Sequence, residues 1–218
     1  MIYKKIIITQ RTDKIAPNYE IRDNLDTLWT TFFNRFNNDK QTILLYPLPN
    51  FVDNLNAWVD AISPDGILLS GGNTISDEVA VQRKNIELQL LDYAANKNIP
   101  VLGVCRGMQM LAYWQKIPLV ETQQNHIAVR HNISFSPIFS YPQKFTENVN
   151  SYHKFMIQQN AQNLQNFDII ATSENDNCIE MIKHKNKNIF GIMWHPEREE
   201  NLKNFDKILV ENVFNLVF

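Results

Sequence analysis

A cysteine placed between two glycines is the clearest chemical signal in this sequence. Residues 101–111 form an apolar run up to Gly103, a turn at Cys105, and a helix-like stretch that follows Gly107. A nucleophile on a tight strand-to-helix turn leaves no room for side chains beside it, which gives the glycines a steric purpose. The start of a helix also favours a thiolate. The pattern predicts a thiol nucleophile at Cys105, whereas a lone cysteine is more often an inert core residue.

A histidine and a glutamate two residues apart, His195 and Glu197, are partners that such a thiol can use. The apolar residues 190–194 predict a strand, and Pro196 favours an extended backbone at His195. Residues i and i+2 of an extended strand project to the same side. A carboxylate orients a histidine and stabilises its charged form, while the histidine activates the nucleophile. We predict a triad of Cys105, His195 and Glu197, although His195 alone fits a core-edge histidine equally well.

Attack of a thiolate on an acyl carbon also needs hydrogen-bond donors for the oxyanion that forms. The segment Ser70-Gly71-Gly72-Asn73 follows an apolar run, and consecutive glycines let backbone N–H groups converge on an anion. The predicted donors are the backbone N–H groups of Gly72 and of Arg106, the residue after the cysteine. Taken alone, a Gly-Gly pair more often marks a plain tight turn.

The composition indicates a globular protein with one domain over residues 1–218. This length can bury a full core, and the formal net charge of −2 argues against electrostatic binding of nucleic acid. The sequence has two cysteines, Cys105 and Cys178, which argues against disulfides and favours a reducing compartment. The first apolar run is too short for a signal peptide and no stretch is long enough for a membrane span. We therefore expect a cytoplasmic protein that binds neither membranes nor nucleic acid.

Strands that alternate with helices are predicted for the first half of the chain. Because the strands are continuously apolar, they indicate a parallel sheet covered on both faces. Strands are predicted at 3–9, 42–46, 65–70 and 101–104, helices at 24–36, 51–62, 76–97 and 108–114, and a polar loop at 10–18. The polar residues 118–163 predict short antiparallel strands such as 129–135, followed by strands at 167–173, 178–183 and 188–193 and a helix at 199–216. The predicted fold is a doubly wound, mostly parallel α/β sheet flanked by helices, with a small antiparallel extension.

Four segments resemble the class I glutamine amidotransferase-like family, and their spacing resembles its γ-glutamyl hydrolase (C26-type) branch. They are Ser70-Gly-Gly72, Gly103-Val-Cys-Arg-Gly-Met-Gln109, Asn150-Ser-Tyr-His153 and Trp194-His-Pro-Glu197. The resemblance covers nearly the whole chain and implies a flavodoxin-like fold, a γ-glutamyl thioester intermediate, and the triad and oxyanion roles given above. It also implies that the glutamyl group is bound by Gly71, Gln109, Asn150, Ser151, Tyr152 and His153, of which Ser151 and His153 fit ordinary loop residues as well.

The N-terminal part of the chain resembles one subgroup of this family. Thr9-Gln-Arg11, residues 20–26 and Trp29 are similar to hydrolases that cleave γ-glutamyl-CDP-amidate in capsule phosphoramidate synthesis, giving glutamate and cytidine diphosphoramidate. A diphosphate requires cationic partners, although each basic residue taken alone is more often a solvated surface charge. The candidates are Arg11, Arg22, Arg83, Arg106 and Lys154. Asn73 follows the Gly-Gly pair, where γ-glutamyl-polyamine hydrolases often carry an acidic residue, which argues against a polyamine or γ-aminobutyrate substrate.

Alternatives to this substrate remain open at the level of sequence. The chain fits a free-standing hydrolase of this or another small γ-glutamyl amide, and it also fits a glutaminase subunit that supplies ammonia to a separate synthetase. A non-catalytic binding domain fits the complete triad poorly. No cofactor is predicted, and the absence of a Walker-type loop makes any nucleotide a substrate.

No metal is predicted from the sequence. Its remaining histidines show no metal-ligand spacing, and no cysteine pair accompanies them. These histidines are His126, His131, His153 and His184. Cys178 is expected to be a packed strand residue.

Overall fold

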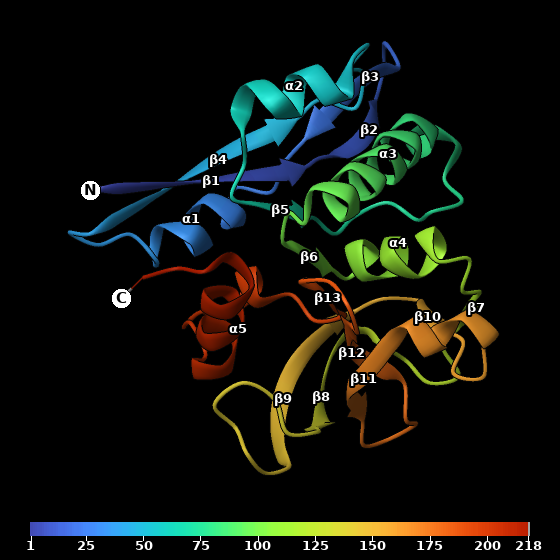
Figure 1. The fold of residues 1–218 in the computed structure, drawn as a ribbon. Helices are drawn as coiled ribbons and strands as arrows, with labels where there is room; N and C mark the ends of the chain where they lie inside the picture. The colour runs from blue at the N-terminus through green and yellow to red at the C-terminus, as the bar shows by residue number, and fades with distance from the viewer. Residues whose placement is uncertain (218) are drawn as a thin grey trace.

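A nine-stranded sheet forms the centre of the computed structural model, which describes residues 1–217 apart from the side chain of residue 163 (Figure 1). Its parallel part consists, in spatial order, of β4 (Gln41–Leu48), β1 (Ile2–Thr9), β5 (Gly66–Leu69), β6 (Val101–Val104) and β13 (Ile189–Ile192). Antiparallel strands then continue it through β12 (Ile179–His184), β11 (Phe167–Ser173), β8 (Ile127–Phe135) and β9 (Phe145–Tyr152). The predicted fold class is confirmed.

Helices cover both faces of the parallel part. On one face lie α2 (Leu55–Ile62), α3 (Val81–Lys97) and α4 (Arg106–Trp114), and on the other lie α1 (Leu28–Asn34) and α5 (Asn204–Phe214) (Figure 1). Successive side chains of a strand point to opposite faces, so both faces of a strand between two helix layers must be apolar. In β1, Ile6 and Ile8 accordingly join the cluster on the α1–α5 face and Ile7 joins the other cluster.

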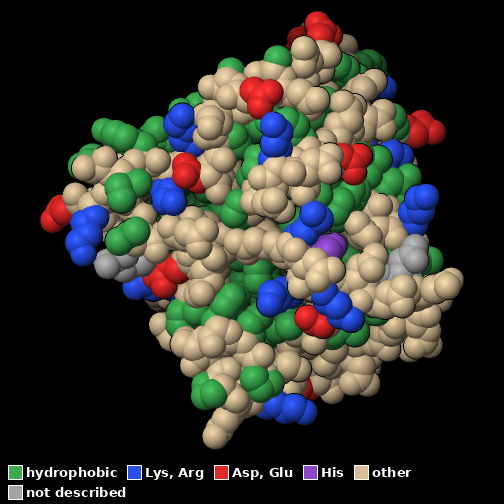
Figure 2. Space-filling model, viewed as in Figure 1, with side chains coloured by type: hydrophobic (Ala, Val, Ile, Leu, Met, Phe, Trp, Pro, Cys, Tyr) green, Lys and Arg blue, Asp and Glu red, His purple; other side chains and the backbone are tan. Residues whose placement is uncertain are grey.

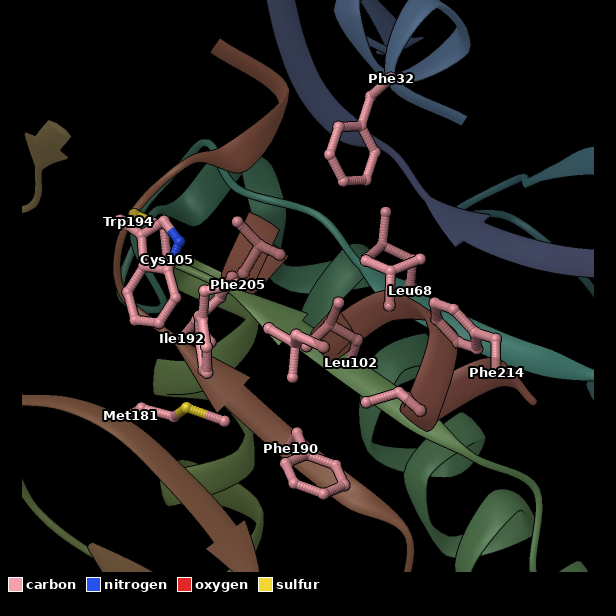
Figure 3. Packing of buried hydrophobic residues seen from close by; sticks show 14 of the residues in the cluster. Phe32, Leu68, Leu102, Cys105, Met181, Phe190, Ile192, Trp194, Phe205 and Phe214 are labelled. Atoms are coloured by element: carbon pink, nitrogen blue, oxygen red, sulfur yellow. The ribbon is translucent and has the colours of Figure 1, made fainter. Parts of the chain in front are cut away.

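The core on the α1–α5 face is rich in aromatic side chains. Figure 3 shows Phe32 of α1 and Phe214 of α5 packed towards the strand residues Leu68 and Leu102. Cys105 lies in the same cluster, at the end of β6. The thiol that the sequence predicts to be the nucleophile therefore lies at the end of a central strand of the sheet.

The N-terminal segment differs most from the prediction. The predicted polar loop at 10–18 contains β2 (Arg11–Ile15), which pairs with β3 (Glu20–Asn24) as an antiparallel hairpin, and the predicted helix at 24–36 begins only at Leu28. The hairpin is largely exposed, so its sequence lacks the alternation of apolar and polar residues that would have indicated strands.

Other element boundaries shift by a few residues. The predicted helix at 76–97 starts as a 3-10 turn, η1 (Glu78–Ala80), and the predicted helices at 51–62 and 199–216 begin only at Leu55 and Asn204. Within residues 118–163, β7 (Leu119–Glu121) pairs with β10 (Phe155–Ile157) beside the main sheet, and η2 (Gln162–Asn166) follows. Across the described residues, every helix is too short or too polar to cross a lipid bilayer.

Candidate active site

The thiol of Cys105 lies on a sharp turn between β6 and α4. The backbone of this residue has φ 53° and ψ −106°. Residues other than glycine rarely adopt this backbone conformation, so the turn is strained. The flanking glycines permit it, because a Cβ at Gly103 would lie 2.6 Å from the backbone of Gly107 and a Cβ at Gly107 would lie 2.1 Å from the carbonyl oxygen of Leu69. The strand–turn–helix arrangement and the steric reason for its glycines agree with the prediction.

His195 and Glu197 form a buried pair immediately after β13. The Nδ1 atom of His195 lies 2.6 Å from Oε1 of Glu197, and both side chains are almost fully buried. The prediction that both residues project from one strand is wrong in its detail. His195 is extended, but Glu197 lies in a 3-10 turn, η3 (Pro196–Arg198), because Pro196 occupies the first position of that turn. The turn folds the carboxylate back onto the ring.

The thiol of Cys105 and the carboxylate of Glu197 both act on the ring of His195. Burial lowers the pKa of His195, but the negative charges of Cys105 and Glu197 and hydrogen bonds to both residues raise it to about 9. At neutral pH the ring is therefore protonated. A cysteine beside a protonated imidazole can attack an electrophilic carbon, and the ring can then deliver a proton to the leaving group.

The backbone of His195 is held by Asn150 at the end of β9. Oδ1 of Asn150 accepts a hydrogen bond from the His195 N–H at 2.9 Å, and its Nδ2 donates to the His195 carbonyl at 2.8 Å. Tyr152, two residues along the same strand, places its ring edge-on to the imidazole at a centroid distance of 5.7 Å. The resemblance implied that both residues bind the glutamyl group, but the side chain of Asn150 is already engaged with the protein. Asn150 thus fixes the position of the ring.

The loop after β5 carries the predicted oxyanion donor. Arg83 of α3 donates hydrogen bonds to the carbonyl oxygens of Ser70 at 2.7 Å, Gly71 at 3.1 Å and Gly72 at 2.6 Å. Because the N–H of a trans peptide points opposite to its carbonyl, the bond to Gly71 turns the N–H of Gly72 away from Arg83. Gly72 has φ 82°, and a Cβ at Gly71 would lie 2.7 Å from Cε1 of His195. The loop therefore lies directly against the imidazole.

A buried charge network joins this loop to the nucleophile turn. Nε of Arg83 lies 2.9 Å from Oε1 of Glu87, and Nη1 of Arg106 bonds Oε2 of the same carboxylate. Burial would raise the pKa of Glu87, but Arg106 and Arg83 hold it below its usual value, and burial lowers the pKa of Arg83 to about 10. Both guanidinium groups are buried, and the assignment of Arg83 and Arg106 to a diphosphate stays a prediction.

A small cleft borders His195 on the side of the β2–β3 hairpin. Its lining includes Arg11, Trp29, Gly72, Glu197 and Arg198 in addition to the imidazole. In Figure 2, Lys and Arg side chains lie around a histidine visible near the middle of the face. The cleft therefore offers positive charge next to the predicted base.

The other two cationic candidates lie away from this cleft's lining. Arg22 pairs with Glu20 on the exposed hairpin, and Lys154 lies 3.1 Å from Glu121 on the surface. Of the five basic residues suggested by the sequence, Arg11 is thus the one that lines the cleft.

A larger cavity of about 510 Å³ lies beside α4, one turn beyond Cys105. Gln109 and Phe155 line it together with Ile75, Lys84 and Tyr113. Nε2 of Gln109 donates to the carbonyl oxygen of Phe155 at 2.9 Å, which ties α4 to β10. Space for a substrate group is therefore present on the side where the resemblance places the glutamyl moiety.

Comparison with protein families agrees with this geometry. Residues 20–215 match the family described as glutamine amidotransferase class-I. The chain belongs to this family. A curated member of similar length is a γ-glutamyl-CDP-amidate hydrolase of Campylobacter jejuni, 33% identical over 217 residues that cover 96% of this chain and 97% of that protein.

Other relatives of this class-I amidotransferase chain belong to synthetases. A glutamine-hydrolysing GMP synthase subunit of Methanocaldococcus jannaschii is 33% identical over 153 residues, covering 66% of this chain and 73% of that protein. A solved structure described as a GMP synthase subunit of Thermoplasma acidophilum superposes with a TM-score of 0.67 at 20% identity, covering 98% of this chain and 93% of that one. That likeness establishes the common fold.

Two features of this amidotransferase-family site escaped the sequence analysis. Arg198 lines the cleft beside His195, and its guanidinium stacks on the ring of Tyr152 at 4.5 Å. Its position directly after Glu197 was the available signal. The second feature is that Ser151 and His153 point away from the cleft into a buried cluster, where Ser151 donates to the carbonyl of His126 at 2.9 Å. Their assignment to the glutamyl site stays a prediction without support from these contacts.

Proposed function

We propose that the chain is a thiol-dependent hydrolase that removes the glutamyl group from γ-glutamyl-CDP-amidate. The observation that carries the proposal is the strained Cys105 turn next to a His195 ring that Glu197 holds in its charged form. The substrate is suggested by the near full-length similarity to the Campylobacter jejuni hydrolase. The products would be glutamate and cytidine diphosphoramidate.

The reaction runs in two steps. The Cys105 thiolate attacks the γ-carbonyl carbon, and the resulting oxyanion accepts hydrogen bonds from the backbone N–H groups of Gly72 and Arg106. The carbon–nitrogen bond breaks while the His195 imidazolium protonates the departing nitrogen, which leaves a γ-glutamyl thioester. Water then attacks the thioester and gives up a proton to His195, and glutamate leaves as the carbon–sulfur bond breaks and the thiolate and imidazolium are regenerated.

The cleft at His195 and the cavity at Gln109 suggest where the halves of the substrate bind. The 510 Å³ cavity at Gln109 is assigned to the glutamyl half, and the cleft at Arg11 and Arg198 is assigned to the diphosphate. Arginine binds phosphate oxygens through paired N–H donors, and His195 itself lines the cleft. The nitrogen that receives the proton would therefore lie next to the ring.

The first experiment measures glutamate release from γ-glutamyl-CDP-amidate by wild type and Cys105→Ala. We expect the variant to lose turnover by at least about 10⁴-fold, because no other group replaces the thiol, while its circular dichroism and thermal midpoint stay those of the wild type. Turnover by the folded variant at the wild-type rate would refute the mechanism.

The second experiment tests the diphosphate cleft. Arg11→Ala and Arg198→Ala should each raise KM for the nucleotide amidate about 10-fold, which corresponds to one charge-assisted hydrogen bond. They should leave KM unchanged for a γ-glutamyl amide that lacks phosphate. Arg22→Ala is the matched control, because it removes a guanidinium from the same hairpin outside the cleft lining. Equal effects of all three variants would place the diphosphate elsewhere.

A second candidate function rests on the GMP synthase relatives, which are named as subunits of glutamine-hydrolysing synthetases. In this case the chain would hydrolyse glutamine and pass ammonia to a separate synthetase. Rapid glutamate release from the nucleotide amidate with negligible glutaminase activity supports the first function. Glutaminase activity that rises only when a synthetase is added would support the second.

A further inference from the structure

A second group of reactive side chains lies buried within the antiparallel part of the sheet. The ligand atoms of His126, His153, Cys178 and Glu180 all lie within 4.8 Å of one another, and all four residues are buried. Pairing of β8 with β9 brings the first two together, since the N–H of His153 donates to the carbonyl oxygen of His126 at 3.1 Å. Glu180 is the second residue of β12, and Cys178 directly precedes this strand. The group is distinct from the triad and has no part in the mechanism above.

The polar atoms of this group are poorly satisfied by the protein. Both carboxylate oxygens of Glu180, both ring nitrogens of His153 and Nε2 of His131 are buried without a well-formed hydrogen bond among the described residues. A buried polar group without a partner costs about 1–3 kcal/mol, and a charged group costs more. Such atoms gathered around one point indicate that a cationic group completes the site.

The distances fit a tetrahedral metal ion. Zinc binds histidine nitrogen, cysteine sulfur and carboxylate oxygen at about 2.0–2.3 Å, so ligand atoms on a tetrahedron are separated by about 3.3–3.8 Å. Oε1 of Glu180 lies 3.4 Å from Nε2 of His153 and 3.8 Å from Nδ1 of His126. The remaining separations of up to 4.8 Å would have to shorten when an ion binds.

The surroundings of the ligands also match those of metal sites. A histidine that binds a metal through one ring nitrogen commonly bonds a carboxylate through the other. Nε2 of His126 lies 2.9 Å from Oδ2 of Asp176, while its Nδ1 lies 3.4 Å from Oγ of Ser151 and 3.8 Å from Oε1 of Glu180. His131, whose Nε2 lies 3.3 Å from Oε1 of Glu180, is positioned to support that carboxylate.

We propose that His126, His153, Cys178 and Glu180 bind a structural zinc ion. The charges of one thiolate and one carboxylate balance a divalent cation, so the occupied site is neutral in the protein interior. Nitrogen and sulfur ligands favour zinc over magnesium or calcium, and four protein ligands leave no open position for catalysis. Burial raises the pKa of Cys178, so the residue is a thiol until a metal binds, and binding of the metal releases that proton to solvent. The sequence predicted no metal because motif spacing detects ligands that are near one another along the chain.

The zinc would stabilise the end of β9, the strand that positions the predicted base His195. His153 follows directly after Tyr152 of β9, and this strand also carries Asn150, which bonds both backbone groups of His195. Occupancy of the site therefore stabilises the orientation of the imidazole from a distance. The proposal does not depend on which γ-glutamyl compound is hydrolysed.

The test uses metal content and spectroscopy, and it needs no activity measurement. Protein that is produced with zinc and purified without chelators should contain about one zinc ion per chain, as measured by inductively coupled plasma mass spectrometry. Cobalt(II) in its place should give a thiolate-to-metal absorption band in the near ultraviolet. Cys178→Ser should lose the band and most of the zinc. Cys105→Ser is the matched control because it removes the other thiol of the chain, and it should keep both signals.

A second variant separates the metal site from general damage to the fold. Asp176→Asn should weaken zinc binding about 10–100-fold in a chelator competition, as expected for loss of an outer carboxylate, while circular dichroism stays unchanged. Wild-type protein that remains below about a tenth of an equivalent of zinc after refolding with the metal overturns the proposal. Zinc that persists in folded Cys178→Ser overturns it as well, because the ion then lies elsewhere.

Discussion

Two buried charge clusters support the two halves of the candidate active site, and they are built differently. Arg83, Glu87 and Arg106 lie beneath the nucleophile turn and the oxyanion loop, where both oxygens of the carboxylate have a guanidinium partner. Glu180 lies beneath the strand that holds His195, where neither oxygen has a well-formed hydrogen bond. The first cluster supplies its own cations, whereas the second gathers imidazole rings and a thiol around an anion. The contrast suggests that the second cluster is completed by a cation from solution.

The largest effect is expected from breaking the first cluster. Glu87→Gln removes the charge that two buried guanidinium groups share, which should lower the free energy of unfolding by about 3–5 kcal/mol. Urea denaturation followed by circular dichroism measures the change. A loss below about 1 kcal/mol would mean that the guanidinium groups find other partners or water, and the contrast between the clusters would disappear.

A smaller effect is expected from emptying the second cluster. Chelation of zinc should lower the thermal midpoint, and zinc added back at 100 times its dissociation constant should restore about 2.7 kcal/mol of stability. Differential scanning calorimetry with and without zinc gives the value. Magnesium at the same concentration serves as the control, and an equal response to it would rule out the nitrogen and sulfur ligands.

A third buried carboxylate, Asp206, extends the comparison because, among the described residues, it has neither an arginine partner nor a group of possible metal ligands around it. Oδ1 accepts a hydrogen bond from Nε1 of Trp194 at 2.9 Å, and Oδ2 has no partner among the described residues. Burial raises the pKa of Asp206 to about 7. The folded pKa exceeds the unfolded value near 3.9, so its contribution to stability is fully present below about pH 3.9 and is lost progressively as the pH rises from there through about 7.

Asp206→Asn should therefore stabilise the protein by about 1–2 kcal/mol at pH 8 and change it little at about pH 3.5, because the amide carries no charge to bury. Thermal unfolding at the two pH values measures the difference. Equal effects at both pH values would show that the carboxyl group does not titrate in this range.

The smallest predicted change concerns the pH profile of the reaction. Because the pKa of His195 is raised to about 9, the imidazolium that protonates the leaving nitrogen is present below this value and is lost above it. A plot of kcat/KM against pH should thus fall on its alkaline side near pH 9. Arg22→Ala should keep the same midpoint, and a midpoint near 6.5 in the wild type would show that the ring lacks its negative neighbours.

The predictable parts of this molecule are those whose signal is local in the sequence. The glycines beside Cys105 predict the turn because any side chain there would collide with backbone, and His195-Pro-Glu197 predicts the base and its orienter. The continuously apolar strands predict the doubly wound sheet. Each of these patterns lies within a few residues.

The parts that escaped prediction depend on pairing over long distances. Asn150 lies on β9, which joins the sheet only through its pairing with β8, and no local pattern encodes its contact with His195. Glu87 and Arg106 meet through the packing of α3 against α4, and Arg11 reaches Gly72 through an exposed hairpin that resembles a loop in sequence. The fold, and not spacing along the chain, brings these residues together.

The most direct test of the account is to trap the covalent intermediate. Protein quenched in acid during turnover of γ-glutamyl-CDP-amidate should carry one glutamyl group, and peptide mass spectrometry should locate it on Cys105, with none on Cys178. When the substrate is exhausted, the wild-type enzyme should lose the adduct, because water that gives its proton to His195 hydrolyses the thioester. Glutamate release without any adduct on Cys105, or an adduct on another residue, would contradict the mechanism.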